Sequence, residues 1–444
     1  MSDSNLKAAA VPRSRLSRLT GMGTLAGRIA GNALIESGKQ LLNGQKPRAT
    51  DILLTEANIR QVADKLAKMR GAAMKVGQLL SMDSGNLLPS ELAAILERLR
   101  ADAMTMPPSQ LYDVLERNWG EAWQDRFHRF SFEPIAAASI GQVHKATTHD
   151  GREMAVKIQY PGVRQSIDCD IDNVVSMMRL SGLLPKDLDI APLVEEARKQ
   201  LHYEADYLRE GQQIEAYRVF VDSFHRQEEL NLPEFHQDLS TQEILCMSHL
   251  PGLALEKGIA RHPSEADRVI TLLMDLFFAE LAQFRCVQTD PNLANYLYDP
   301  VSGCVMLLDF GAVRHFSDEF VGKYLCALRA ATHEDRDGLR AALEALGFFQ
   351  AGGRAANVEI VLDIFLLATE PLRHEGMYDF GKAELAKRIQ TMGRTISSDP
   401  DAWHTPPPDV LFLHRKMGGL YLMAARLGAK VDAKTLFERH LSAY

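Results

Sequence analysis

Hydrophobic and polar residues alternate along several short segments between residues 130 and 160, with the period of half-buried β-strands. These segments are expected to form three antiparallel strands, at 132–137, 141–147 and 153–160. Asp150-Gly151 supplies a hairpin turn before the last of them. Two later segments, 232–235 and 243–247, are predicted to be strands as well. The pattern therefore indicates a small sheet in the first half of the chain.

Apolar residues recur at helical spacing through most of the remaining chain. The helices predicted on this basis lie at 51–84, 90–100, 108–119, 163–180, 191–201, 319–332, 336–346, 358–369, 380–391 and 409–427. The densest apolar segment, 272–284, contains Asp275 and Glu280. These charges and its short length predict a buried helix rather than a membrane span. The expected fold class is α+β.

Composition narrows the function classes. The formal net charge of −8 and the isoelectric point near 6.0 argue against a nucleic-acid-binding protein, because such proteins are usually basic. The five cysteines are scattered and form no C-x-x-C motif. We therefore expect neither a zinc site nor a disulfide framework, and we expect a reducing compartment.

Residues 11–34 combine apolar positions at helical spacing with four arginines, and Asp3 is the only acid before Glu36. One interpretation is an amphipathic helix that contacts an anionic membrane surface. An equally supported interpretation is a helix packed on the main body. The third in rank is a mitochondrial transit segment, because such segments are rich in arginine and poor in acids.

The strongest candidate chemistry lies between residues 288 and 311. Asp290 and Asn295 have the D-x-x-x-x-N spacing of a kinase catalytic loop, and Asp309-Phe310-Gly311 follows after a turn and an apolar strand. Phosphoryl transfer needs a carboxylate near the attacking oxygen, and an amide and a second carboxylate to hold Mg²⁺. Asp290, Asn295 and Asp309 are assigned these roles in that order.

Each of these motifs has an ordinary explanation when it stands alone. Asp-Phe-Gly occurs by chance, and Asp290-Pro-Asn is a common turn sequence. The two motifs at this separation favour a kinase-like site.

The predicted sheet contains the expected nucleotide-binding residues. Lys157, on the third strand, is predicted to pair with the α- and β-phosphates. The first turn carries alanines where an ordinary kinase has glycines, so the turn is expected to be stiffer, because alanine seldom adopts positive φ. Residues 247–250 are predicted to form the hinge beside adenine. The full predicted set on this part of the chain is Ala136, Ala137, Ala138, Ser139, Gly141, Val143, Ala155, Lys157, Met247, Ser248 and Leu250.

An acidic cluster follows the inserted helical segment at 161–200. Glu210 is the expected partner of Lys157, and Glu204 and Asp206 are additional acids. The alternative for this cluster is a solvated helix face. Near the N-terminus, Lys75 and Gln78 are three residues apart and therefore share a helix face.

These motifs together resemble the UbiB/AarF group of atypical kinases, on its coenzyme Q biosynthesis branch. The resemblance covers residues 11–430, and its most specific parts are Lys75-Val-Gly-Gln78, the alanine-rich turn and Glu204-Ala-Asp206. It implies a bilobal kinase-like fold with a helical extension across the active site. The implied division is an extension at 1–125, an N-lobe at 126–250 and a helical C-lobe at 251–444.

The resemblance also implies contacts and partners. Lys75 is expected to meet Glu204, and Lys75 and Gln78 are expected to gate the site. Glu204 and Asp206 of the E-x-D element are expected to belong to the site as well. The implied ligands are ATP or ADP and Mg²⁺. The implied partners are an anionic membrane surface and ubiquinone-biosynthesis proteins or quinone intermediates. The implied location is peripheral to a membrane, cytoplasmic in a bacterium or on the matrix face of the mitochondrial inner membrane in a eukaryote.

Three functional hypotheses follow. The first is an atypical kinase or ATPase that supports ubiquinone biosynthesis by ATP hydrolysis or small-molecule phosphorylation. The second is a nucleotide-switched pseudokinase scaffold. The third, a protein kinase, is the least favoured because the chain lacks the A-P-E segment after Gly311.

Overall fold

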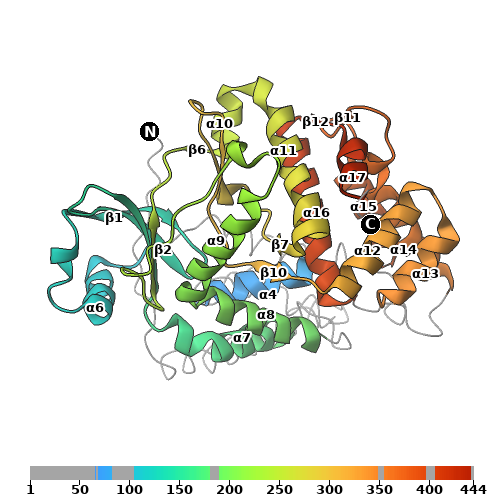
Figure 1. The fold of residues 1–444 in the computed structure, drawn as a ribbon. Helices are drawn as coiled ribbons and strands as arrows, with labels where there is room; N and C mark the ends of the chain where they lie inside the picture. The colour runs from blue at the N-terminus through green and yellow to red at the C-terminus, as the bar shows by residue number, and fades with distance from the viewer. Residues whose placement is uncertain are drawn as a thin grey trace, which may run out of the picture. The chain divides into compact units, whose positions relative to one another are not determined.

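The computed structural model describes residues 66, 69–82, 105–180, 190–348, 355–396 and 406–441, whose helices and strands are drawn in Figure 1. The chain divides into two units. The described residues of the first unit lie within 66–81, 105–211 and 235–249, and those of the second are Met82 and the described residues within 212–234 and 250–441. Helix α9, Tyr207–Asp222, crosses this division. The mixed helix and sheet content confirms the α+β class. The predicted three-part division stays a prediction.

The first unit contains the predicted sheet. Its four strands are antiparallel in the order β1-β2-β3-β5, and their bounds are Arg129–Ala137, Gly141–Thr147, Glu153–Gln159 and Ile244–Ser248. Gly151 has a φ of +87°, which the β2–β3 hairpin turn requires and which glycine adopts without strain. The strand predictions near 132–160 and 243–247 are therefore confirmed.

Helix α6, Pro108–Trp119, and the 3₁₀ turn Trp123–Arg126 pack on this sheet. The apolar face of α6 meets the apolar side chains of the central strands in one cluster that includes Leu111, Leu115, Val156 and Ile158. The indole of Trp119 donates to the carbonyl of Leu239 at 2.9 Å. These contacts hold β3 rigidly, because its side chains are buried along nearly its whole length.

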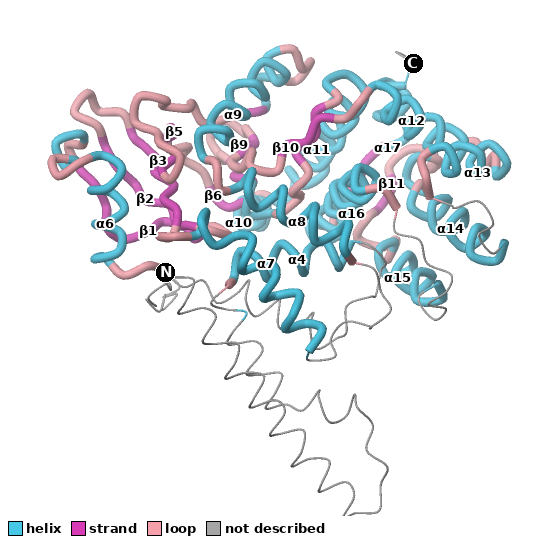
Figure 2. Tube along the Cα trace, turned by 90° about the horizontal axis from the view of Figure 1, so that it is seen from below, coloured by secondary structure: helices cyan, strands magenta, loops and turns pink. Residues whose placement is uncertain are grey.

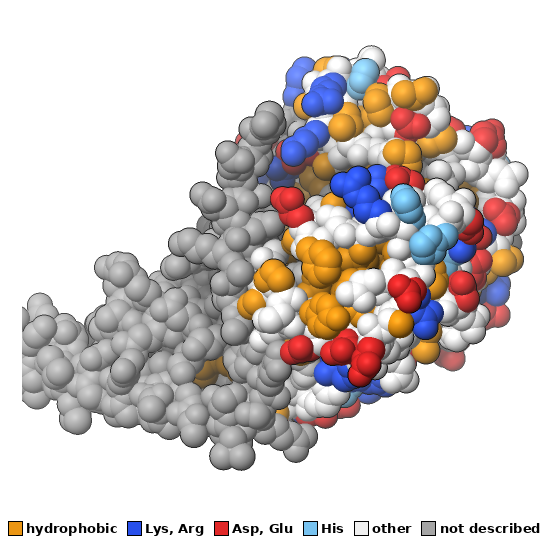
Figure 3. Space-filling model, turned by 90° about the vertical axis from the view of Figure 1, so that its left-hand side faces the viewer, with side chains coloured by type: hydrophobic (Ala, Val, Ile, Leu, Met, Phe, Trp, Pro, Cys, Tyr) orange, Lys and Arg blue, Asp and Glu red, His pale blue; other side chains and the backbone are white. Residues whose placement is uncertain are grey.

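Strand β1 is the edge of the sheet, and most of its side chains are accessible. Phe132 and Ile135 are about half exposed, at 47% and 52%. Figure 3 views the side of the molecule on which β1 is drawn, and it shows apolar side chains gathered among charged ones. Two irregularities in the β1–β2 register flank Pro134, and they interrupt the edge for pairing with another strand.

Helices also belong to the first unit. Helix α4, Arg70–Met82, is the described part of the helix predicted at 51–84. Helices α7, Val163–Leu180, and α8, Ala191–Glu204, form the predicted insertion and lie against each other (Figure 2). The helices predicted at 11–34 and 90–100 lie outside the described residues.

The second unit is mainly helical. Helix α11, Ala266–Ala279, is its centre, because nearly every side chain on it is buried. It ends in a π-helical turn, Glu280–Phe284, and it packs against α16, Pro408–Leu427, and α17, Ala433–Leu441. The other helices are α10 (Leu255–Arg261), α12 (Asp318–Thr332), α13 (Arg336–Ala345), α14 (Ala355–Ala368) and α15 (Leu385–Ile396). Among the described residues, no helix is long and apolar enough to cross a membrane.

Short strands in the second unit hold the loops of the candidate site. The largest sheet has the order β4-β9-β8-β6, and β7 pairs with β10 separately. The bounds are Leu230–Asn231 for β4, Leu253–Ala254 for β6, Cys286–Gln288 for β7, Tyr296–Tyr298 for β8, Val305–Leu307 for β9 and Val313–His315 for β10. The predicted strand before Asp309 is therefore present.

Two element predictions were wrong in position. The strand predicted at 232–235 lies at β4 instead, because Pro233 has no N–H to donate to a ladder. The helix predicted from residue 380 begins at Leu385, because Tyr378–Asp379 (β11) pairs with Lys430–Val431 (β12).

Candidate nucleotide and magnesium site

Lys157 and Glu210 form a buried ion pair within the first unit. The Lys157 ammonium donates to both carboxylate oxygens of Glu210, at 2.7 and 2.9 Å. Lys157 sits on β3 between Val143 and Leu245 of the neighbouring strands, and Glu210 lies in the first turn of α9. The lysine side chain is 11% exposed and that of Glu210 is 1% exposed. Two charge-assisted hydrogen bonds to one carboxylate restrict the position of the ammonium group.

The alanine-rich turn lies beside this pair in the sheet. The N–H of Ala138 donates to the carbonyl of Gly141 at 2.9 Å, which closes the turn between β1 and β2. A Cβ on Gly141 would lie 2.3 Å from the carbonyl oxygen of Ile158, so only glycine fits there. Ala136 and Ala137 are exposed at the end of β1. Ala155 lies on β3 opposite Met247 of β5.

Lys75 contacts Glu204 in a second ion pair of the first unit, and both side chains are largely buried. Glu204 also accepts a hydrogen bond from the hydroxyl of Ser139 at 3.2 Å. Helix α4 approaches the same turn closely, because a Cβ on Gly71 would lie 2.7 Å from a methyl group of Ile140. The helix that carries Lys75, the alanine-rich turn and the acidic cluster are thus in mutual contact.

The remaining predicted residues of the first unit have separate positions. The Asp206 carboxylate accepts from the N–H of Arg209 at 3.2 Å, so Asp206 caps the first turn of α9. Gln78 lies on α4, and its side chain is outside the described residues. Met247 and Ser248 end strand β5 in the first unit, and Leu250 is assigned to the second unit.

Asp290, Asn295 and Asp309 come together within the second unit. The Asn295 amide donates to the Asp290 carboxylate at 3.1 Å and to its backbone carbonyl at 3.3 Å. The backbone N–H of Leu308 donates to the carbonyl of Asn295 at 3.0 Å, which joins the loop to the strand before Asp309. Asp309 accepts from the N–H of Gly311 at 2.9 Å. Phe310 is fully buried, so the aspartate beside it is anchored.

These residues fit a magnesium ion. Mg²⁺ prefers a few carboxylate or amide oxygens completed by water and phosphate oxygens. Asp309 offers a carboxylate, and the Asn295 amide nitrogen is the atom that faces Asp290, so its amide oxygen is available. The part of the chain that the structure describes has no group of three histidine, cysteine, aspartate or glutamate side chains that could hold a metal.

Two residues of α16 contact this loop, and sequence reasoning missed both. Arg415 makes an ion pair with the Asp290 carboxylate. Lys416 donates to the Gln288 side-chain oxygen at 3.1 Å and to the Tyr296 hydroxyl at 3.3 Å. No local signal could have found them, because α16 follows the loop by about 125 residues.

Lys416 also faces Glu280, at the start of the π-helical turn. The two charged groups are 3.7 Å apart and almost completely buried. Burial raises the pKa of the Glu280 carboxyl, although Lys416 opposes this shift. Burial is the largest influence on Lys416 and by itself would lower the pKa, but Glu280, Tyr296 and Asp290 together outweigh it and the pKa is raised. Lys416 is therefore a cation at neutral pH.

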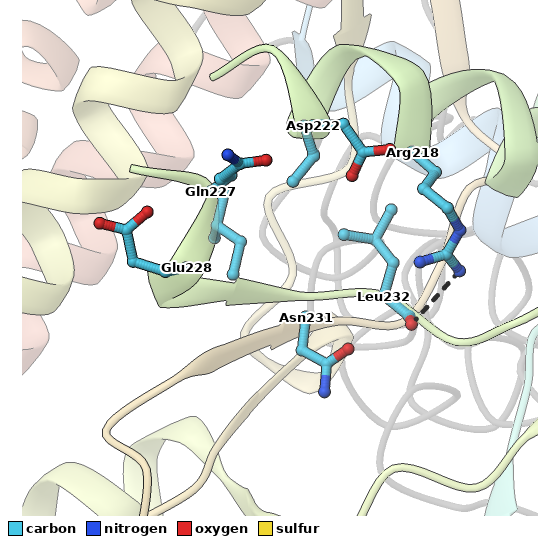
Figure 4. A pocket seen from close by; sticks show the side chains of 8 residues that line it. Arg218, Asp222, Gln227, Glu228, Asn231 and Leu232 are labelled. Atoms are coloured by element: carbon cyan, nitrogen blue, oxygen red, sulfur yellow. Dashed lines mark hydrogen bonds between the residues drawn. The ribbon is translucent and has the colours of Figure 1, made fainter. Parts of the chain in front are cut away.

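A separate hollow of about 340 Å³ lies between the end of α9 and β4. Figure 4 shows Arg218, Asp222, Gln227, Glu228, Asn231 and Leu232 around it. The Arg218 guanidinium donates to the carbonyls of Leu232 and Pro233, at 3.4 and 2.6 Å. None of the predicted site residues lines this hollow.

Comparison with known proteins gives one consistent family. Residues 98–343 match the model of the ABC1 atypical kinase-like domain. The chain is 34% identical to the mitochondrial atypical kinase COQ8 of Saccharomyces cerevisiae, over 98% of this chain and 86% of that protein. It is 36% identical to the mitochondrial atypical kinase COQ8B of Rattus norvegicus, over 96% and 80%.

A solved structure has the same fold. It is the complex of Rv3197 with erythromycin from Mycobacterium tuberculosis, which is 27% identical with a TM-score of 0.57. The match covers 86% of this chain and 95% of that one.

Proposed function

The chain belongs to the ABC1 atypical kinase-like family, and on that premise we propose that it binds Mg-ATP or Mg-ADP and supports ubiquinone biosynthesis. The proposed reaction is ATP hydrolysis or phosphorylation of a small molecule or lipid intermediate. The observation that carries the proposal is the cluster of Asp290, Asn295 and Asp309 within one loop system.

Each residue receives one role. Lys157 binds the α- and β-phosphates, and Glu210 holds it in place. Asn295 and Asp309 hold Mg²⁺, which when bound neutralises charge on the phosphates. Asp290 orients the attacking hydroxyl or water.

The nucleotide is proposed to lie against the sheet of the first unit. The alanine-rich turn, with Ser139 and Gly141, covers the phosphates. Val143 and Ala155 of the sheet contact the base, and Met247, Ser248 and Leu250 offer backbone groups to adenine.

A small substrate is favoured over a protein substrate. Only six residues, 312–317, separate Gly311 from α12, and three of them form β10. A kinase activation segment that docks a peptide does not fit in this interval. Lys75 and Gln78 are proposed to gate access, and Glu204 and Asp206 to belong to the same part of the site, because Glu204 joins the Lys75 helix to the alanine-rich turn. Quinone intermediates at an anionic membrane surface are the proposed substrates or cargo.

The first test is thermal stability with Mg-ATP and Mg-ADP, for wild type and Asp309→Asn. A ligand at a hundredfold excess over its dissociation constant stabilises the folded state by about 2.7 kcal/mol. We expect a magnesium-dependent rise in melting temperature that Asp309→Asn abolishes. An equal rise in the variant contradicts the assignment of Asp309.

A second candidate is a nucleotide-switched scaffold without turnover. It is favoured by the Asp290 carboxylate, which is engaged by both Arg415 and Asn295. Phosphate release in the presence of anionic lipid and a quinone-precursor mimic separates the two. Release that depends on Asp290 supports an enzyme, and nucleotide binding without release supports the scaffold.

A further inference from the structure

One buried side chain joins the two loops that carry the proposed catalytic and metal-binding groups. The Gln288 amide nitrogen donates to the backbone carbonyl of Asp290 at 3.0 Å and to that of Asp309 at 3.2 Å. Gln288 is 6% exposed and ends strand β7. Because one NH₂ group serves both carbonyls, its position sets the separation of the two loops.

An amide can turn over, and something must keep its nitrogen toward the carbonyls. The oxygen and nitrogen ends of glutamine have nearly the same shape but opposite hydrogen-bonding character. Lys416 contacts the oxygen end at 3.1 Å, and an ammonium can only donate. Lys416 therefore permits only the orientation in which the Gln288 nitrogen faces Asp290 and Asp309.

Glu280 contacts both Gln288 and Lys416. One of its oxygens accepts from the backbone N–H of Gln288 at 2.9 Å and from the Tyr217 hydroxyl at 2.6 Å. The carboxylate also faces the Lys416 cation at 3.7 Å. Glu280 thus holds both the backbone of Gln288 and the group that orients its side chain. It opens the π-helical turn, and such turns frequently occur at functional sites.

The proposed metal ligands are next to this network. A cavity of only about 10 Å³ is lined by Asn295, Asp309, Gln288 and Lys416 together. That is the room of about one water molecule. Little free space separates the four side chains, so a shift of Lys416 or Gln288 is transmitted to the ligands.

We propose that Lys416 and Gln288 are positioning residues that set the geometry of Asp290 and Asp309 for a magnesium–nucleotide complex. This inference rests on the proposed function. The rival explanation is that Lys416 only neutralises the buried Glu280 carboxylate. The rival predicts that removing both charges restores both the stability and the magnesium dependence of wild type. The positioning role predicts that removing both charges restores the stability alone.

The test compares four full-length proteins: wild type, Lys416→Met, Glu280→Gln/Lys416→Met and Tyr217→Phe. The double variant has no buried charge, and replacing a buried ion pair by neutral groups is often harmless to stability. Tyr217→Phe removes a different hydrogen bond of Glu280 and leaves Gln288 and Lys416 in place. Melting temperature is measured without ligand, and then with fixed ADP over a magnesium titration.

We expect the double variant to recover the ligand-free melting temperature of wild type. Its half-saturating magnesium concentration should stay raised by about tenfold, because partners behind metal ligands typically change metal affinity by 10–100-fold. ADP binding without magnesium should change less than about twofold, since these residues act on the metal ligands. Tyr217→Phe should keep the wild-type magnesium dependence even where its melting temperature falls.

Two results overturn the inference in different ways. A double variant with wild-type magnesium dependence leaves only the charge-neutralising role, and the proposed function stands. If the ADP-induced stabilisation of the wild-type protein does not depend on the magnesium concentration, both the proposed function and this inference are wrong.

Discussion

Two buried lysine–glutamate pairs, Lys157–Glu210 of the first unit and Lys416–Glu280 of the second, are built differently. Lys157 and Glu210 make two short hydrogen bonds, at 2.7 and 2.9 Å. Lys416 and Glu280 stay 3.7 Å apart, and the ammonium donates to Gln288 and Tyr296 instead. The first lysine is 11% exposed and the second 4%. The Lys157 ammonium thus donates to its own partner carboxylate, while the Lys416 ammonium donates to an amide oxygen and a phenol instead.

The comparison shows that distance alone does not define the role of a buried ion pair. What matters is which atoms accept the hydrogen bonds of the ammonium group. Lys157 donates to its partner carboxylate, whereas Lys416 donates to the amide oxygen of Gln288 and the phenol of Tyr296.

The largest effect is expected when the Lys157–Glu210 pair is broken. Lys157→Met leaves the Glu210 carboxylate buried without its cation, so the free energy of unfolding should fall by about 3–5 kcal/mol. Nucleotide-induced stabilisation should disappear as well. Urea unfolding of the variant measures the first effect. Glu210→Gln/Lys157→Met is the control, and it should recover most of the stability but not the response to nucleotide.

An intermediate effect is expected in the pH dependence of stability that arises from the Lys416–Glu280 pair. The raised pKa of Glu280 means that the folded state binds more protons than the unfolded state above the ordinary value of 4.5. Stability from this group is therefore present at low pH and falls as pH rises through the raised pKa. In Lys416→Met the cation that opposes the shift is gone, so the pKa should rise further, and the decline in stability should extend to higher pH and be larger in total.

Urea unfolding across a pH series measures this decline. Glu280→Gln/Lys416→Met should lose the additional decline, because no carboxyl remains at that position. A Lys416→Met protein whose stability declines over the same pH range as wild type contradicts the assignment to Glu280.

The smallest effect is expected from a short but exposed pair. Lys323 and Glu319 are 2.6 Å apart on the surface of α12, closer than Lys416 and Glu280. Solvent and salt screen such a pair, so Lys323→Ala should leave the urea midpoint within error. A loss as large as that of Lys416→Met contradicts the view that burial, rather than distance, governs these pairs.

Much of the fold could be predicted because its signals are local. The bounds of α6, α7 and β2 follow directly from apolar period and turn residues. The errors near residues 232 and 380 also have local causes, Pro233 and the β11–β12 pairing. The second of these depends on a strand about fifty residues later, so no local pattern indicates it.

The sequence by itself determined the chemistry of the candidate site. Asp290, Asn295 and Asp309 are close together in the chain, and the spacing that phosphoryl transfer requires is visible there. The lysine on β3 and the acidic cluster were likewise identified from type and order. Their roles stay predictions until the variants are measured.

Only the tertiary structure decided what holds that chemistry in place. Lys416 meets Gln288 across 128 residues of chain, and Arg415 meets Asp290 across 125. Neither contact has a spacing that secondary structure imposes, because α16 is far from the loop in the chain and meets it only in the folded unit, where α16 also packs on α11. A residue that acts on substrate must have a particular chemistry, which its type reveals. A residue that positions another needs only to be in the right place, and that place exists only after the chain has folded.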